Sequence, residues 1–218
     1  MSRFLFISGI FALSVVSVFA SPASAQLQKG LFAGWNNTGW TGSVPGDSGG
    51  SFESKSSYCF GAHLGGELSG NFSWRAEILY SRKGAKTVQL GTDESGTSTG
   101  DVHYYFNVNY LEIPALATYT IPTRGAFSPV LYLGPAIDFE LSSELDAQYP
   151  SGVKYAFGGD QNLDETSSPD FSLIFAGGVD IDTGNTLVNV QIRYVMGLKE
   201  IYRSSKNRTL TVMAGIGI

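Results

Sequence analysis

The sequence is poor in the side chains that most catalytic and metal sites require. It contains one cysteine, Cys59, and two histidines, His63 and His103, among 218 residues. A single thiol excludes an internal disulfide and a multi-cysteine zinc site. Two imidazoles also provide few side chains for general-base catalysis or metal binding. We therefore expect no catalytic residues, no metal site and no cofactor.

Charge is also scarce, and its balance is acidic. Charged residues make up 15% of the chain, with 14 Lys and Arg against 19 Asp and Glu and a net charge of −5. No basic stretch offers a face for a phosphate backbone, so we expect no nucleic-acid partner. Aromatic residues make up 13% of the chain, which argues against disorder because disordered chains contain few of them.

Long hydrophobic runs are absent except at the N-terminus. Arg3 precedes an apolar run from Phe4 to Phe19, and Ala23-Ser24-Ala25 follows as a small-residue cleavage site. This order predicts a secretory signal peptide over residues 1–25 and one mature domain over residues 26–218. A membrane anchor is the alternative, but the run is short for a spanning helix of about 20 residues.

The mature chain shows a period of two. Phe72, Trp74, Ala76, Ile78 and Tyr80 share one parity, and polar residues occupy much of the other. Alternation of this kind predicts β-strands. Eight such segments can be placed, at about 28–37, 57–68, 72–90, 104–121, 128–143, 169–183, 186–202 and 208–218.

The connections between these segments alternate in length. Short ones at 69–71, 122–125 and 183–185 contain Gly or Asn, which tight turns favour. The others are mostly long, at 38–56, 91–103, 144–168 and 203–207. Outer-membrane barrels combine an even number of antiparallel strands with short periplasmic turns and longer extracellular loops. The sequence therefore predicts an all-β fold, an eight-stranded antiparallel up-and-down transmembrane β-barrel.

Three features indicate that the apolar parity faces lipid and the polar parity faces a narrow lumen. The polar parity mixes opposite charges with glycines, the signal peptide directs the chain to the envelope, and aromatic residues recur near strand ends, where interfacial girdles lie. The glycines are Gly61, Gly65, Gly134 and Gly178, and the aromatic residues are Tyr58, Phe72, Trp74, Tyr119, Phe127 and Tyr202.

Four short motifs resemble the outer-membrane β-barrel domain family, often called the porin family. They are Tyr110-Leu111-Glu112-Ile113-Pro114, the segment from Ile78 to Ala85, the segment from Arg193 to Leu198, and Lys206-Asn207-Arg208. The resemblance covers about residues 30–218. It implies an eight-stranded barrel in the outer membrane of a diderm bacterium, and it implies no general activity or binding site.

Four charged residues fall on the inward parity near mid-barrel depth: Arg75, Glu77, Glu112 and Arg193. An eight-stranded barrel is just wide enough for side chains to fill, and buried charges must be paired. We expect a polar network in which Arg193 reaches both carboxylates. The network is either a static plug or the gate of a narrow pore. Pro114 removes one ladder hydrogen bond, and we expect a β-bulge there.

Other motifs lack the partners that their chemistry requires. Gly46-Asp47-Ser48-Gly49-Gly50 spells a serine-protease nucleophile loop, but no histidine precedes Ser48 as that family's order demands. Asp180 and Asp182 begin like a calcium loop, but the later ligand positions hold Thr183 and Val190. Four acidic residues give an acidic outer loop, which we interpret as solvated: Asp160, Asp164, Glu165 and Asp170.

We therefore predict a non-enzymatic outer-membrane protein with a structural, binding or adhesive role through its extracellular loops. The alternatives are a lipid-modifying enzyme that uses His103, a narrow gated pore, and a secreted soluble ligand-binding barrel. The expected partners are outer-membrane lipids and lipopolysaccharide, the barrel assembly machinery and an unknown extracellular ligand.

Overall fold

The computed structural model describes residues 27–42, 52–92, 97–157, 169–200 and 205–217. The expected signal peptide, residues 1–25, lies outside them, so the division of the chain near residue 26 stays a prediction. The described residues form nine strands: β1 (Gln28–Thr41), β2 (Lys55–Ser69), β3 (Phe72–Thr92), β4 (Ser98–Thr120), β5 (Phe127–Gln148), β6 (Lys154–Phe157), β7 (Asp170–Asp182), β8 (Leu187–Gly197) and β9 (Lys206–Gly217). No helix among these residues is long and apolar enough to cross a membrane.

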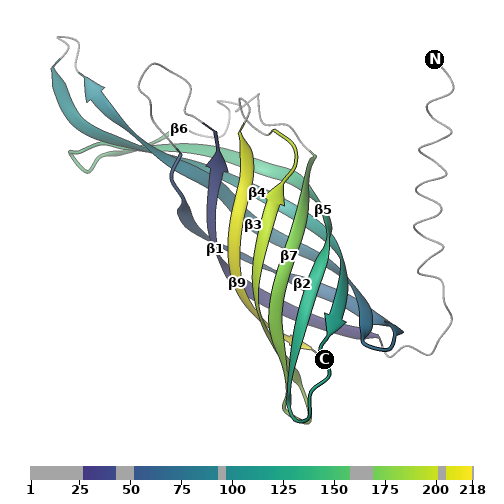
Figure 1. Ribbon diagram of the computed structural model, residues 1–218. Helices are drawn as coiled ribbons and strands as arrows, with labels where there is room; N and C mark the ends of the chain where they lie inside the picture. The colour runs from purple at the N-terminus through teal and green to yellow at the C-terminus, as the bar shows by residue number, and fades with distance from the viewer. Residues whose placement is uncertain (1–26, 43–51, 93–96, 158–168, 201–204, 218) are drawn as a thin grey trace, which may run out of the picture.

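Eight of these strands close into an antiparallel ring (Figure 1). Each strand pairs with its neighbours in the chain, β5 pairs with β7, and β1 pairs with β9 to close the ring. The predicted eight-stranded up-and-down barrel is thus confirmed. The short strand β6 lies outside the ring and pairs only with the end of β5, at residues 145–148. It occupies part of a segment for which the sequence predicts a loop.

The two parities of each strand face different surroundings, as the sequence predicts. On β8, Ile192 points out of the barrel and is 58% exposed, whereas Gln191 and Arg193 point inward and are 1% exposed. On β5, Leu131 and Leu133 are likewise exposed. An apolar outer wall is stable only against lipid, because exposed apolar area of this extent is unfavourable in water.

One end of the barrel carries three tight turns, which join β2 to β3, β4 to β5 and β7 to β8. Gly70, Gly125 and Gly184 in these turns have positive φ angles of 58°, 128° and 89°. Gln28 begins β1 and Gly217 ends β9, and each pairs with a neighbouring strand near the same end. Short turns mark the periplasmic side of an outer-membrane barrel, so the opposite end is extracellular.

Three neighbouring strands continue far beyond the rest of the barrel at the extracellular end. Strands β3, β4 and β5 have 21, 23 and 22 residues, whereas about 9–11 suffice to cross a membrane. We call residues 84–92, 98–107 and 142–148, together with β6, the extracellular arm. Figure 1 shows the β3–β4 hairpin projecting past the other strands. The predicted loops at 91–103 and 144–168 are therefore partly β-structure.

The expected bulge at Pro114 is wrong. The pairing of β3 with β4 passes from Ala76 and Ala115 to Leu79 and Glu112 without a change of register, although the pairs between them are missing. Proline removes a hydrogen-bond donor but inserts no residue, so the interruption needs no bulge. The register shift between β4 and β5 lies further along, at Asn109 and Tyr110.

Candidate functional site

The lumen contains two ion-pair networks. In the first, Arg193 of β8 donates two hydrogen bonds to Glu77 of β3, at 2.8 and 2.9 Å. The Nε of Arg75 lies 2.8 Å from Oε1 of the same carboxylate, the oxygen that also accepts one of the hydrogen bonds from Arg193. The Arg75 guanidinium also lies over the rings of Phe32 and Tyr132, 5.7 and 5.6 Å from their centroids. Such bidentate geometry holds a buried carboxylate firmly in place.

The second network is centred on Lys83. Its Nζ lies 2.8 Å from an oxygen of Glu112 and 3.0 Å from Oδ2 of Asp138. Ser172 donates a further hydrogen bond to Asp138. Arg193 therefore pairs with one of its two expected carboxylates, Glu77, while Glu112 pairs with a lysine that the sequence analysis overlooked.

The two lumen residues that the expected network omitted could have been predicted from the sequence. Lys83 and Asp138 both lie on the inward parity of predicted strands, the parity that carries Glu77 and Glu112. Lys83 stands beside Gly84 near the end of the motif from Ile78 to Ala85, so its place in the sequence does not by itself indicate mid-barrel depth. The two networks together balance three basic groups against three carboxylates.

Side chains fill the lumen where the two networks meet. Lys83, Glu112 and Arg193 border a cavity of about 10 Å³. A volume of this size holds about one water molecule. In the wall of this cavity, Thr211 donates to Asn36, and Thr209 donates to Thr38. The arrangement is chemically suited to a packed polar core.

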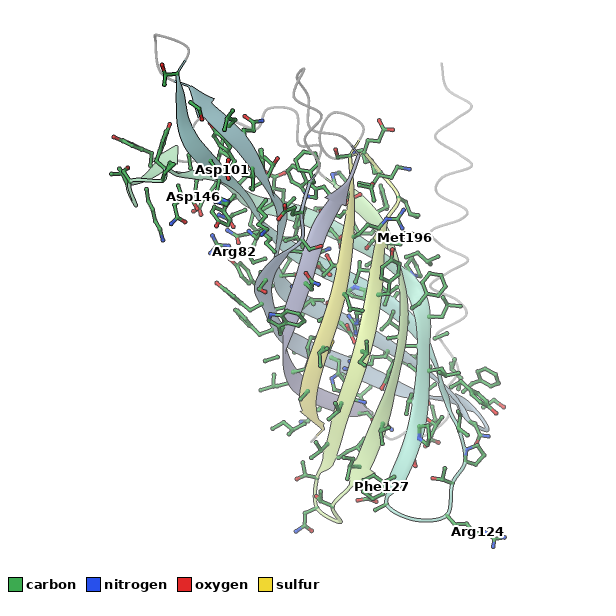
Figure 2. All side chains as sticks on the ribbon, turned by 60° about the vertical axis from the view of Figure 1, so that its left-hand side comes forward. Arg82, Asp101, Arg124, Phe127, Asp146 and Met196 are labelled. Carbon is green, nitrogen blue, oxygen red and sulfur yellow. The ribbon has the colours of Figure 1, made fainter. Side chains whose placement is uncertain are left out.

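A larger cavity, of about 770 Å³, lies on the outer face of the arm near its base. Its lining includes four basic side chains, Lys55, Arg82, Lys86 and Lys154, and one carboxylate, Asp146. We call it the arm cleft. In Figure 2, Arg82 and Asp146 lie on the arm side, whereas Arg124 and Phe127 lie at the opposite end of the barrel. Sequence reasoning missed the cleft because its lining comes from five separate segments.

Lys55 is the most enclosed cation of the cleft. Its ammonium group donates to the carbonyl oxygen of Phe106 at 3.1 Å and to the side chain of Asn107. Both acceptors belong to β4, so the lysine side chain crosses β3 near Gly84, the partner of Asn107 in the ladder. This end of β2 lies outside the membrane-spanning segment. Burial, followed by repulsion from Arg82, lowers the pKa of Lys55 to about 8.

The remaining motifs have local roles or lie elsewhere. Ser48 and its glycine-rich segment, and the acidic residues 160, 164 and 165, lie outside the described residues. Asp182 accepts a hydrogen bond from the backbone of Gly184 and so stabilises a periplasmic turn. His103 pairs with Val88 and Gln148 across the arm. Among the described residues no group of three metal-ligating side chains comes together.

A closed antiparallel barrel with an apolar wall, a charged lumen and short turns at one end is the architecture of an outer-membrane β-barrel protein. The chain belongs to the outer membrane protein β-barrel domain family, whose sequence profile matches residues 19–203. The protein therefore resides in the cell outer membrane, and the alternative of a secreted soluble barrel is wrong. Outer-membrane lipids surround its wall.

Solved structures with a similar fold come from several bacteria. Neisserial surface protein A is 14% identical with a TM-score of 0.51, over 90% of this chain and 99% of that chain. OprG from Pseudomonas aeruginosa is 13% identical with a TM-score of 0.48, over 88% and 93%. Ail from Yersinia pestis is 10% identical with a TM-score of 0.40, over 88% and 98%. At such identities the first likeness supports the fold alone. No curated protein matches the chain.

Proposed function

We propose that the protein is a non-enzymatic outer-membrane barrel that binds an extracellular ligand through its arm, while the lumen serves as a static structural core. The observation that carries the proposal is the length of β3, β4 and β5, each about ten residues longer than a membrane crossing requires. A barrel with a purely structural role needs no such extension.

The arm is built as an ordered surface. Its inner face packs on an apolar cluster in which the Trp40 ring lies 5.1 Å from that of Phe106 and 5.2 Å from that of Phe52. Ala85 and Val108 in the same cluster are fully buried. Rigid surfaces bind with a smaller loss of conformational entropy than mobile loops do. This packing supports a binding role for the outer face.

The lumen supports a structural role. Its charges form paired networks, and the cavity bordered by both networks has room for about one water molecule. We therefore prefer a static plug to a gated pore. The lipid-modifying alternative has no support at His103, whose cross-strand neighbours are Val88 and Gln148 rather than a serine. We also propose the barrel assembly machinery as a partner during folding.

An arm-shortened variant tests the binding role. Residues 88–103 are replaced by Asn-Gly, a pair that favours a two-residue hairpin turn between Thr87 and Tyr104. The wild type and the variant, both purified in detergent, are applied to an array of glycans and extracellular proteins. We expect the wild type to be retained on at least one component and the variant to lose that retention. Equal binding by both proteins, or no binding by the wild type, would contradict the proposal.

A further inference from the structure

The arm cleft lies at the level where the barrel wall leaves the membrane. Just below it, three outward-facing aromatic rings form a cluster: Tyr58 and Phe60 of β2 and Tyr80 of β3. The Phe60 and Tyr80 ring centroids are 5.3 Å apart, and those of Tyr58 and Tyr80 are 6.2 Å apart. In outer-membrane barrels, girdles of aromatic side chains on the outer wall lie at the membrane–water interfaces. The cleft therefore faces the headgroup layer of the outer leaflet.

An apolar groove lies on the membrane side of the same aromatic cluster. It has a volume of about 460 Å³, and Leu31, Phe60, Ala62, Ile78 and Tyr80 are among its lining residues. The groove reaches Tyr80, and the next outward residue of β3 is Arg82, which lines the cleft. Two residues of a strand span about 6.6 Å. One amphiphilic molecule could therefore occupy the groove with an acyl chain and the cleft with its headgroup.

The charges of the cleft suit an anionic headgroup. Arg82 pairs with Glu144 at 3.3 Å, but their side chains are 29% and 49% exposed. Exposed ion pairs of this kind are weak, so a phosphate could displace Glu144 from the guanidinium. Lys55 is held in place by two acceptors and lies near Arg82, so an anion between these two cations would relieve their mutual repulsion.

We propose that the arm cleft and the apolar groove beneath it form a binding site for the phosphorylated lipid anchor of lipopolysaccharide, with Lys55 and Arg82 contacting a phosphate and Ala62 lying beneath an acyl chain. Lipopolysaccharide is the phosphate-bearing lipid of the leaflet that this end of the barrel faces. The site goes beyond the proposed ligand-binding role of the arm and stands independently of it.

Native mass spectrometry of the detergent-solubilised protein, titrated with diphosphoryl lipid A, tests the proposal. The variant Lys55→Gln/Arg82→Gln removes two cations of the cleft. Each basic group near a lipid surface changes affinity about fivefold, so we expect about 25-fold weaker binding. The matched control, Lys29→Gln/Arg124→Gln, makes the same charge change at the periplasmic end and should bind like the wild type. Heat-modifiable migration checks that every variant is folded.

Two further measurements distinguish binding of the lipid from binding of other anions. Ala62→Trp fills the groove without altering a charge, and it should also weaken lipid A binding. Lipid A stripped of its phosphates should bind the wild type as weakly as diphosphoryl lipid A binds the double variant. Inorganic phosphate or soluble heparin that competes fully while Ala62→Trp has no effect would identify a soluble-anion site and overturn the proposal. Equal lipid A affinity of the wild type and the folded double variant would also overturn it.

The site should also depend on pH through Lys55. The charged groups that face it are Arg82 and Lys86 of β3, Glu144 and Asp146 of β5, and Lys154 of β6, together with the Tyr105 hydroxyl of β4. The pKa of Lys55, about 8, means that its side chain is in the ammonium form below pH 7 and loses this charge above pH 9. Lipid A affinity should therefore fall across this range in the wild type. The lipid A affinity of the Lys55→Gln protein should not show this fall. Identical pH profiles of the wild type and the variant would exclude Lys55 from the site.

Discussion

At the scale of single residues, alternation along each strand decides which side chains contact lipid. Ile192 lies at the middle of β8 on the outer wall, and Val188 lies on the same face near the periplasmic end. The cost of placing a charge on such a wall depends on depth, because the membrane centre holds no water to solvate it.

The variant Ile192→Arg should lower the free energy of unfolding by about 2–4 kcal/mol, whereas Val188→Arg should cost about 0–1 kcal/mol. Urea-induced unfolding from phospholipid vesicles measures both values. Equal costs for the two variants would show that the membrane is not centred on Ile192.

The lumen networks make a second prediction at this scale. Lys83 is the shared partner of Glu112 and Asp138, whereas Glu77 has both Arg75 and Arg193. Lys83→Met should therefore destabilise the barrel by about 3–5 kcal/mol, and Arg193→Ala should cost less because Glu77 keeps Arg75. Adding Asp138→Asn to Lys83→Met should recover part of the loss. Urea-induced unfolding from phospholipid vesicles tests this ranking. A larger loss of unfolding free energy for Arg193→Ala than for Lys83→Met would contradict it.

At the scale of strands, the sequence predicted the barrel well and the arm poorly. The expected segments 28–37, 57–68 and 72–90 lie within the observed strands β1, β2 and β3, because alternation is strong where one face meets lipid. Residues 98–103 contain Ser, Thr, Gly and Asp, so their composition resembles a loop. Their pairing with β3 and with the end of β5 depends on contacts between distant segments. The same limit explains why the cleft was missed, whereas Lys83 lies on the inward parity of its strand and could have been predicted.

Gly84 tests how the arm is attached to the barrel. Its φ of +134° resembles that of Gly125, +128°, so alanine adds similar backbone strain at both positions, about 1–3 kcal/mol. A Cβ at Gly84 would also collide with the carbonyl oxygen of Phe106, whereas a Cβ at Gly125 would meet nothing. Gly84→Ala should therefore loosen the arm and increase its cleavage by protease, while Gly125→Ala should not. Equal cleavage of the two proteins would exclude Gly84 as the critical residue.

At the scale of the whole molecule, the protein combines a closed barrel with a projecting arm. A packed lumen predicts low conductance in planar bilayers for the wild type. The double variant Arg193→Ala/Glu77→Ala should also conduct poorly, because Lys83, Glu112 and Asp138 still occupy the lumen. Frequent openings of the wild type would instead favour the narrow gated pore.

The most direct measurement compares the adhesion of living cells that display the wild type, the arm-shortened variant or Arg193→Ala at equal surface density. The cells are applied to the array component that retains the purified wild-type protein. We expect cells with the arm-shortened variant to lose adhesion and cells with Arg193→Ala to adhere like the wild type. Adhesion that survives loss of the arm but disappears with Arg193→Ala would contradict the account.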